Sequence, residues 1–270
     1  MRGDKEVVLV AVSQNGCSLR LASNELKRDK EVVLAAVNQR GERWKSSFKQ
    51  LKEYALAFAS EGLKGDKEVV LAAVNKHGEA LEFASEEMRG DKEVVLAAVN
   101  QKGYALRHAS EELKGDKEVV LAAVNRCGRA LQFSSDKLKG DKEVVLAAVK
   151  KYGWTLKNTS GFALRHASEE LKRDKEVVLA AVNQHGEELR HASEELKRDK
   201  EVVLAAVNQR GDALEYASEE LKGDKEVVLA SISAVNFCGE VLEYQPSPKT
   251  VVRCATASEE LKGDKDIMLS

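Results

Sequence analysis

One short sequence, D-K-E-V-V-L-A-A-V or a close variant, returns along the chain and limits its fold more than any other feature. Most successive starting aspartates are 25 residues apart, as Asp91 and Asp116 are. The steps that begin at Asp29, Asp141 and Asp224 are longer. Nine complete repeat units and a truncated tenth begin at Asp4, Asp29, Asp66, Asp91, Asp116, Asp141, Asp174, Asp199, Asp224 and Asp264. A regular period of about 25 residues is typical of a solenoid or a similar array.

The repeat unit DKEVVLAAVNQKGYALRHASEELKG, which begins at Asp91, predicts three helical segments. Asp91 is a favoured N-cap for a first helix, and the apolar run 94–99 must be covered on most sides. Gly103 is expected to end that helix as a left-handed C-cap residue. A second helix should follow and break at Ser110, which would cap a last short turn. The equivalent glycines in the other complete units are Gly16, Gly41, Gly78, Gly128, Gly153, Gly186, Gly211 and Gly239.

A unit of this length is too short to fold alone, because chains below about 40 residues usually need outside support. Neighbouring units in a repeat protein supply that support by stacking. The expected fold is therefore all-α: an elongated α-solenoid of stacked 25-residue helix-turn-helix repeats, forming a single array over residues 1–270. The truncated tenth unit has no second helix to cover it, so end-to-end self-association through an uncapped C-terminus is expected.

The three longer steps contain insertions, and two of these carry a structural prediction. In the first, Trp44, Phe48 and Leu51 recur at helical spacing, so a helix is expected across residues 45–53. The last insertion holds both prolines of the chain, Pro246 and Pro248. Because proline cannot donate to a helical hydrogen bond and restricts the residue before it, the chain should leave its helix near Tyr244.

Composition excludes several classes of function. Charged residues make up 33% of the chain, yet Lys and Arg (43) nearly balance Asp and Glu (45), which gives a net charge of −2. A nucleic-acid-binding protein normally carries a basic excess, so no nucleic-acid partner is expected. The first residues show no signal peptide, and no apolar run is long enough to span a bilayer, so we expect a cytoplasmic protein without membrane contact. The four cysteines show no CxxC spacing, which favours reduced thiols over disulfides or metal.

The pattern D-K-E-V-V-L-A-A-V-x-x-x-G-x-A-L-x-x-A-S-E-E-L-K resembles the repeat of the family called domain of unknown function 4116. The family's own unit would span two of the units counted here, and the resemblance covers the chain outside its insertions. More distantly, the pattern is similar to leucine-rich variant repeats, which stack short helices into a superhelix. The resemblance implies an all-helical array and supplies no catalytic or ligand-binding residue.

One position of the repeat is aromatic in some units and histidine in others, whereas the residues around it change little. It lies two residues after the leucine of each second helix, and stacking would place its copies side by side as a column. Leu21 fills it in the first unit, and the candidate binding residues are Phe58, Phe83, His108, Phe133, His166, His191, Tyr216 and Tyr244. The column is either a groove that grips a peptide or partner helix, or the rim that closes the core. The spacing of its histidines does not indicate a metal site.

No HExxH, GxSxG, P-loop or paired-carboxylate motif stands apart from the repeats, so no catalytic residue, metal or cofactor is expected. The predicted function is a non-catalytic helical scaffold that binds a protein or peptide along its variable face. A spacer segment of a longer multidomain protein is the alternative, and a nucleic-acid-binding helical array is a third. The outward positions that could select a partner are Arg20, Glu82, Arg107, Gln132, Arg165, Arg190, Glu215 and Glu243.

Overall fold

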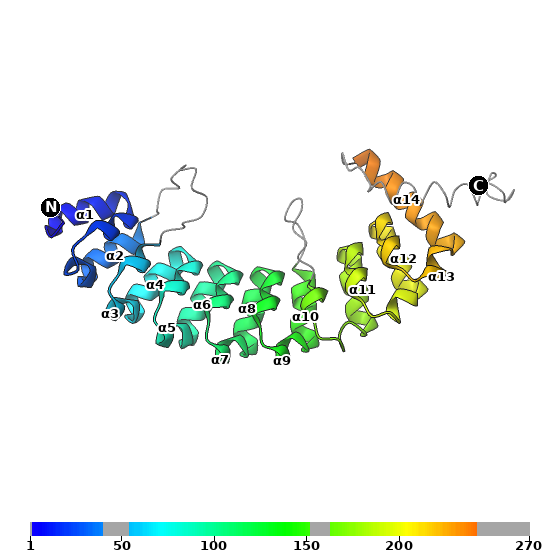
Figure 1. Ribbon diagram of the computed structural model, residues 1–270, viewed down its shortest axis with the longest axis horizontal. Coiled ribbons are helices and arrows are strands. Elements are labelled where there is room, and N and C mark those ends of the chain that lie inside the picture. Colours follow the sequence, from blue (N-terminus) through cyan, green and yellow to red (C-terminus); the bar gives the residue numbers. More distant parts are fainter. Residues whose placement is uncertain (1, 40–53, 152–162, 242–270) are drawn as a thin grey trace. The chain divides into compact units, whose positions relative to one another are not determined.

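The computed structural model describes residues 2–39, 54–151 and 163–241, with side chains as far as residue 234 (Figure 1). These residues form α-helices, short 3₁₀-helices (η) and connecting turns, which confirms the all-α prediction. The chain divides into two compact blocks, Met1–Leu138 and Lys139–Ser270, and the repeats continue in both. We call these the N-terminal and C-terminal blocks.

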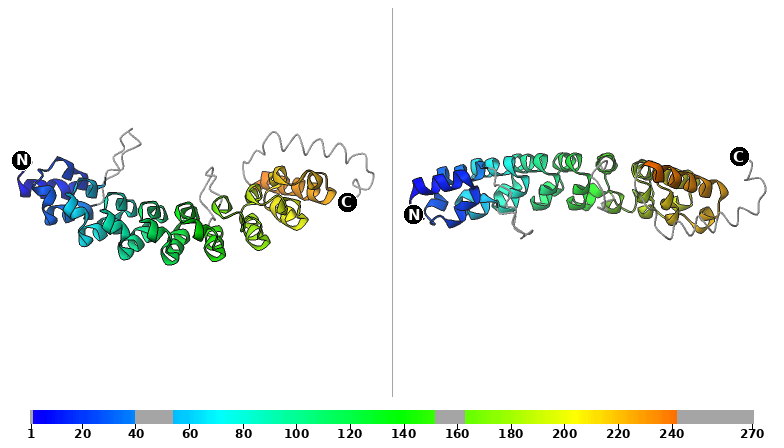
Figure 2. Two further views of the ribbon diagram at one scale, coloured as in Figure 1. Left: turned by 60° about the horizontal axis from the view of Figure 1, so that its bottom comes forward. Right: turned by 90° about the horizontal axis from the view of Figure 1, so that it is seen from above.

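The N-terminal block repeats the order α-helix, 3₁₀-helix, short helical turn. Its long first helices, α2, α4, α6 and α8, stand side by side in one row (Figures 1 and 2). Its elements are α1 (Lys5–Gln14), η1 (Gly16–Leu21), η2 (Leu26–Arg28), α2 (Lys30–Asn38), η3 (Ala55–Phe58), α3 (Glu61–Lys64), α4 (Lys67–Lys76), η4 (Gly78–Phe83), α5 (Glu86–Gly90), α6 (Lys92–Gln101), η5 (Gly103–His108), α7 (Glu111–Lys114), α8 (Lys117–Arg126), η6 (Gly128–Phe133) and α9 (Asp136–Lys139).

The C-terminal block follows the same order, with a longer last helix. Within it α10, α11, α12 and α14 pack in sequence, each against the next. Its elements are α10 (Lys142–Lys150), η7 (Leu164–His166), α11 (Lys175–Gln184), η8 (Gly186–His191), η9 (Leu196–Arg198), α12 (Lys200–Gln209), η10 (Gly211–Tyr216), α13 (Glu219–Lys222) and α14 (Lys225–Val241). The prediction of stacked 25-residue repeats is confirmed within each block.

Each first helix begins as the sequence predicts. In α6 the Asp91 carboxylate accepts hydrogen bonds from the amides of Glu93 (3.0 Å) and Val94 (3.1 Å). The helix then buries four apolar side chains, those of Val94, Val95, Ala98 and Val99. Full burial of a valine contributes about 1.5–3 kcal/mol relative to exposure, so the repeated valines are the main source of core stability.

The predicted role of the glycine that follows each first helix is wrong. The residue that ends α6 is Lys102, in an extended conformation (φ −150°), and Gly103 begins the following 3₁₀-helix without a left-handed φ. A Cβ atom on Gly103 would lie 2.5 Å from the carbonyl oxygen of Ala123 in the next unit. Glycine is therefore required because the backbones of two neighbouring units meet there. Gly16, Gly78 and Gly186 approach the next unit's backbone in the same way.

The second helix is a 3₁₀-helix of six residues rather than an α-helix, as η5 (Gly103–His108) shows. The chain then becomes extended at Ala109 and Ser110, and the Ser110 hydroxyl accepts a hydrogen bond from the Leu113 amide (3.3 Å). The predicted break and cap at Ser110 are confirmed. The Ser110 amide also donates to the Arg89 carbonyl of the preceding unit (2.9 Å), so this extended step ties two units together.

A ladder of lysines joins neighbouring first helices. The Lys92 ammonium lies 2.8 Å from the carboxylates of both Asp116 and Glu118 in the next unit. The same contacts are made by Lys5, Lys30 and Lys67 in the N-terminal block and by Lys142, Lys175 and Lys200 in the C-terminal block. Because solvent screens such exposed pairs, each contributes little to stability.

The ninth unit departs from the prediction that a glycine ends its first helix. Helix α14 runs from Lys225 to Val241 and passes through Gly239 without a stop. Gly239 lies further along the chain from Asp224 than Gly103 lies from Asp91. Gly239 therefore does not occupy the position in the repeat that Gly103 occupies. The helix expected across 45–53, the break near Tyr244 and the tenth unit lie outside the described residues.

Candidate binding surface

The structure brings the column together within each block. In the N-terminal block, Phe58, Phe83, His108 and Phe133 are each the last residue of a 3₁₀-helix, and these helices (η3, η4, η5 and η6) pack one against the next. In the C-terminal block, His166, His191 and Tyr216 end η7, η8 and η10, which also pack in sequence. All seven side chains are half-buried, whereas Leu21 is 55% exposed. Tyr244 lies outside the described residues.

The 3₁₀-helix explains why these side chains are half-buried. Leu106, two residues before His108, is fully buried, and Ala109, one residue after it, is 5% exposed. Arg107 between them is exposed. Each column residue therefore lies at the boundary between the core and solvent, where one side of its ring contacts the core and the other can contact a partner.

Two tyrosines belong to the same surface, and the sequence interpretation missed them. The Tyr54 ring lies 5.9 Å from that of Phe83, and the Tyr104 ring lies 5.9 Å from that of Phe133 in an edge-to-face arrangement. The Arg129 guanidinium lies over Tyr104 at 5.6 Å. In the sequence, each of these tyrosines lies four residues before a column position. Stacking then brings the tyrosine against the column residue of the next unit.

Charged side chains also lie beside the column in the C-terminal block. The Arg190 guanidinium lies 5.6 Å from the centre of the Tyr216 ring, a cation–π contact. Arg210 pairs with both Glu187 (2.6 Å) and Asp212 (2.7 Å), which holds it beside this surface. Each block thus combines aromatic rings with a cation–π contact and a cation–carboxylate pair.

Burial keeps two of the column histidines, His108 and His191, neutral near pH 7. Desolvation lowers the pKa of His108, and the nearby Arg107 lowers it further, although Glu82 at 3.9 Å acts in the opposite direction. Desolvation, with Arg190 and other neighbouring cations, lowers the pKa of His191 to about 4. Neutral histidines offer a flat ring and hydrogen-bonding nitrogens to a partner without adding charge.

One buried acid was not singled out from the sequence. Glu188 is 2% exposed, and its Oε1 atom accepts a hydrogen bond from the Ala163 amide (2.9 Å). Oε2 has no hydrogen-bond partner among the described residues, and burial raises the pKa of this carboxyl to about 8. The regular units carry alanine at this position, as at Ala105. Glu188 thus supports the preceding unit, which contains an insertion.

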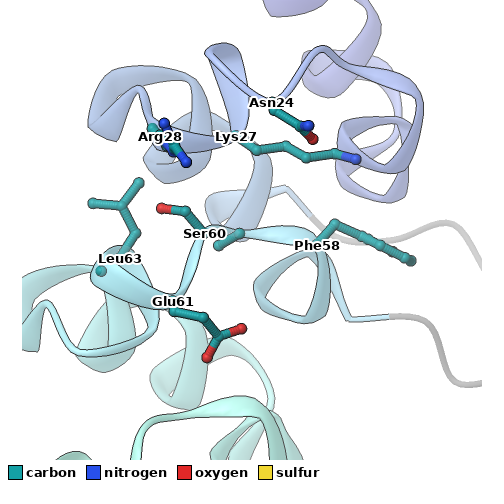
Figure 3. Close-up of a pocket in the computed structure, with 9 residues that line it drawn as sticks. Asn24, Lys27, Arg28, Phe58, Ser60, Glu61 and Leu63 are labelled. Carbon is teal, nitrogen blue, oxygen red and sulfur yellow. The ribbon is translucent and has the colours of Figure 1, made fainter.

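A cleft of about 610 Å³ lies in the N-terminal block where the first two repeat units meet (Figure 3). One wall comes from the turn that ends the first unit, and the other from the end of η3 and from α3. Its lining residues are Asn24, Lys27, Arg28, Phe58, Ala59, Ser60, Glu61, Gly62 and Leu63. The cleft therefore includes Phe58, the first aromatic member of the column.

Other kinds of site receive no support within the described ranges. No cluster of three His, Cys, Asp or Glu side chains there is arranged to hold a metal ion. No helix in the same ranges has the length and apolar character needed to cross a membrane. Cys17 and Cys127 are half-buried, and neither forms a disulfide among the described residues.

The repeats match a known family. A family model described as "Domain of unknown function (DUF4116)" matches residues 4–64, 48–89, 66–114, 91–137, 116–160, 158–197 and 199–247, which confirms the resemblance drawn from the repeated pattern. No curated protein and no solved structure matches the chain.

Proposed function

Because the chain belongs to the DUF4116 family, whose description names no activity, we propose a function from its surface alone: a non-catalytic scaffold that binds a protein or peptide segment along the column. The column is defined by Phe58, Phe83, His108 and Phe133 in the N-terminal block, and by His166, His191 and Tyr216 in the C-terminal block.

The observation that carries this proposal is the row of half-buried rings on packed 3₁₀-helices. Aromatic side chains are enriched at protein interfaces because they offer a large contact area at a small entropic cost. Equivalent rings recur once per repeat unit, so an extended segment could contact several in turn. Next to them lie the exposed side chains of Glu82 and Arg107, which differ from unit to unit and could select a partner.

The proposal is tested by capturing partners from a lysate, with and without nuclease treatment, on three immobilised proteins: the unmodified chain, Phe83→Ala/Phe133→Ala, and Asn100→Ala/Gln101→Ala. The last pair is exposed at the end of α6 and serves as the control. Circular dichroism first establishes that all three are folded.

We expect mass spectrometry to identify proteins retained by the unmodified chain and the control but lost from the column variant. Retention by all three proteins would place binding elsewhere. Retention that disappears on nuclease treatment would favour a nucleic-acid-binding array, and no retention by any of them would favour a spacer.

A further inference from the structure

One wall of the cleft between the first two repeat units lacks an ion pair that five later units have. In five units a glutamate and a lysine three residues later lie within hydrogen-bonding distance, as for Glu111 and Lys114 at 2.7 Å. The other four pairs are Glu61–Lys64, Glu169–Lys172, Glu194–Lys197 and Glu219–Lys222. In the first unit Asn24 occupies the glutamate position, and the Lys27 side chain pairs with no carboxylate among the described residues.

The opposite wall of the cleft is also changed. Gly62 stands where the fourth unit has Glu112, and a Cβ atom added to Gly62 would meet nothing within 4 Å. Behind it Leu63 is half-buried, whereas the equivalent Leu113 is 6% exposed. The missing glutamate side chain therefore leaves an open space beside an accessible apolar surface made by Leu63 and Phe58.

These two changes, together with Arg28 where the third unit has Gly90, reverse the charge of the cleft. Its lining holds two cations, Lys27 and Arg28, and one anion, Glu61. The equivalent positions where the third and fourth units meet hold one cation and three anions, namely Arg89, Glu86, Glu111 and Glu112. Figure 3 shows Lys27 above Phe58, and Arg28 on the side of the cleft where Leu63 lies.

We propose that this cleft binds an acidic peptide segment of a partner protein, with an apolar side chain against Phe58 and Leu63 and carboxylates paired with Lys27 and Arg28. The inference rests on the proposed function, because it assigns a partner chemistry to the N-terminal end of the same surface. A purely phosphate-binding site would not need the apolar wall, which is why a peptide is favoured over a nucleic acid.

The test is a selection of random displayed peptides on the unmodified full-length chain, followed by affinity measurements on Asn24→Glu/Gly62→Glu. This variant restores the residues of the other units, and both substitutions fit open surface, so the fold is preserved. We expect selected peptides that combine Asp or Glu with Leu or Phe, and a loss of affinity of about tenfold or more in the variant. Binding should also weaken as salt concentration rises.

A reciprocal variant sharpens the test. Glu86→Asn/Gly90→Arg/His108→Phe/Glu112→Gly gives the junction of the third and fourth units the lining of the first cleft, and we expect it to add a second binding site for the same peptides.

Selected peptides without acidic residues, or equal affinity for the unmodified chain and Asn24→Glu/Gly62→Glu, would overturn the cleft proposal. If their binding instead depends on Phe83 and Phe133, the scaffold function stands and the cleft inference fails. If the selection yields no specific peptide, the cleft inference fails, whereas the scaffold function is decided by the lysate capture. Preferential binding of a single-stranded oligonucleotide probe would replace the peptide with a nucleic acid.

Discussion

Two junctions between repeat units solve the same packing problem in opposite ways. Where Gly103 meets Ala123 in the N-terminal block, the absence of a side chain lets the backbones of the fourth and fifth units touch, and Ala130 of the fifth unit is fully buried. In the C-terminal block, Glu188 replaces that alanine and bonds to the Ala163 amide of the preceding unit. A regular junction needs small residues, whereas the junction beside an insertion uses a buried carboxyl group to satisfy a backbone amide.

The largest expected effect concerns the pH dependence of the Glu188 junction. The pKa of this carboxyl is about 8 in the folded chain against a reference of 4.5, so the folded state holds a proton that the unfolded state releases. Its contribution to stability is fully present below pH 4.5 and is lost as pH rises to about 8. The full change is on the order of 5 kcal/mol.

Chemical unfolding of the unmodified chain and Glu188→Gln at several pH values measures this effect. We expect the stability difference between the two proteins to change steadily between pH 4.5 and about pH 8. Glu188→Ala should lose the same pH dependence but also leave the Ala163 amide without its partner, which costs about 1–3 kcal/mol. If the free energy of unfolding changed with pH in the same way for all three proteins, Glu188 would ionise as freely as an exposed acid.

The regular junction can be broken by one methyl group. In Gly103→Ala the new Cβ would lie 2.5 Å from the Ala123 carbonyl oxygen and 3.1 Å from the Cys127 Cβ. Because that oxygen belongs to backbone, the units must move apart, at a cost of about 3 kcal/mol. Gly62→Ala is the matched control, since its Cβ meets open space in α3 and should stabilise by about 0.5–1 kcal/mol. Similar melting temperatures for the two variants would contradict the close approach.

The lysine ladder should matter least for stability. Lys92→Met removes contacts to Asp116 and Glu118, and we expect a small loss of stability that shrinks further in high salt. Lys92 holds the pKa of Asp116 below its usual value, so this contribution is present at neutral pH and is lost on acidification. Lys76→Met, at an exposed position, is the control in thermal unfolding. A much larger loss, comparable to that of Gly103→Ala, would make the ladder a principal source of stability.

Much of the fold is predictable because its signals are local and repeated. The aspartate caps, the apolar run of each first helix and the break at Ser110 follow from short-range chemistry, and the period implies stacking. The 3₁₀ conformation of residues 103–108 and the role of Gly103 do not follow, because both depend on how closely the next unit approaches. Sequence periodicity does not report that distance.

The candidate surface was predictable only in outline. The column positions follow from the period, but the contacts of Tyr54 and Tyr104 cross from one unit to the next and need the stacked geometry. Glu188 occupies a position that is alanine in the regular units. A glutamate is usually exposed, so its burial follows from the structure and not from the sequence. Asn24 and Gly62 were readable as departures from the repeat, yet the cleft that they open depends on two units meeting.

The central claim, that the column is the surface that binds a partner, is tested most directly by site-specific photocrosslinking. A photoreactive phenylalanine analogue is placed at His108, within the column, and separately at Asn100, exposed at the end of α6. After irradiation with the partner captured by the unmodified chain, we expect a crosslink from position 108 and none from position 100. A crosslink from position 100 alone, or from neither position, would contradict the claim.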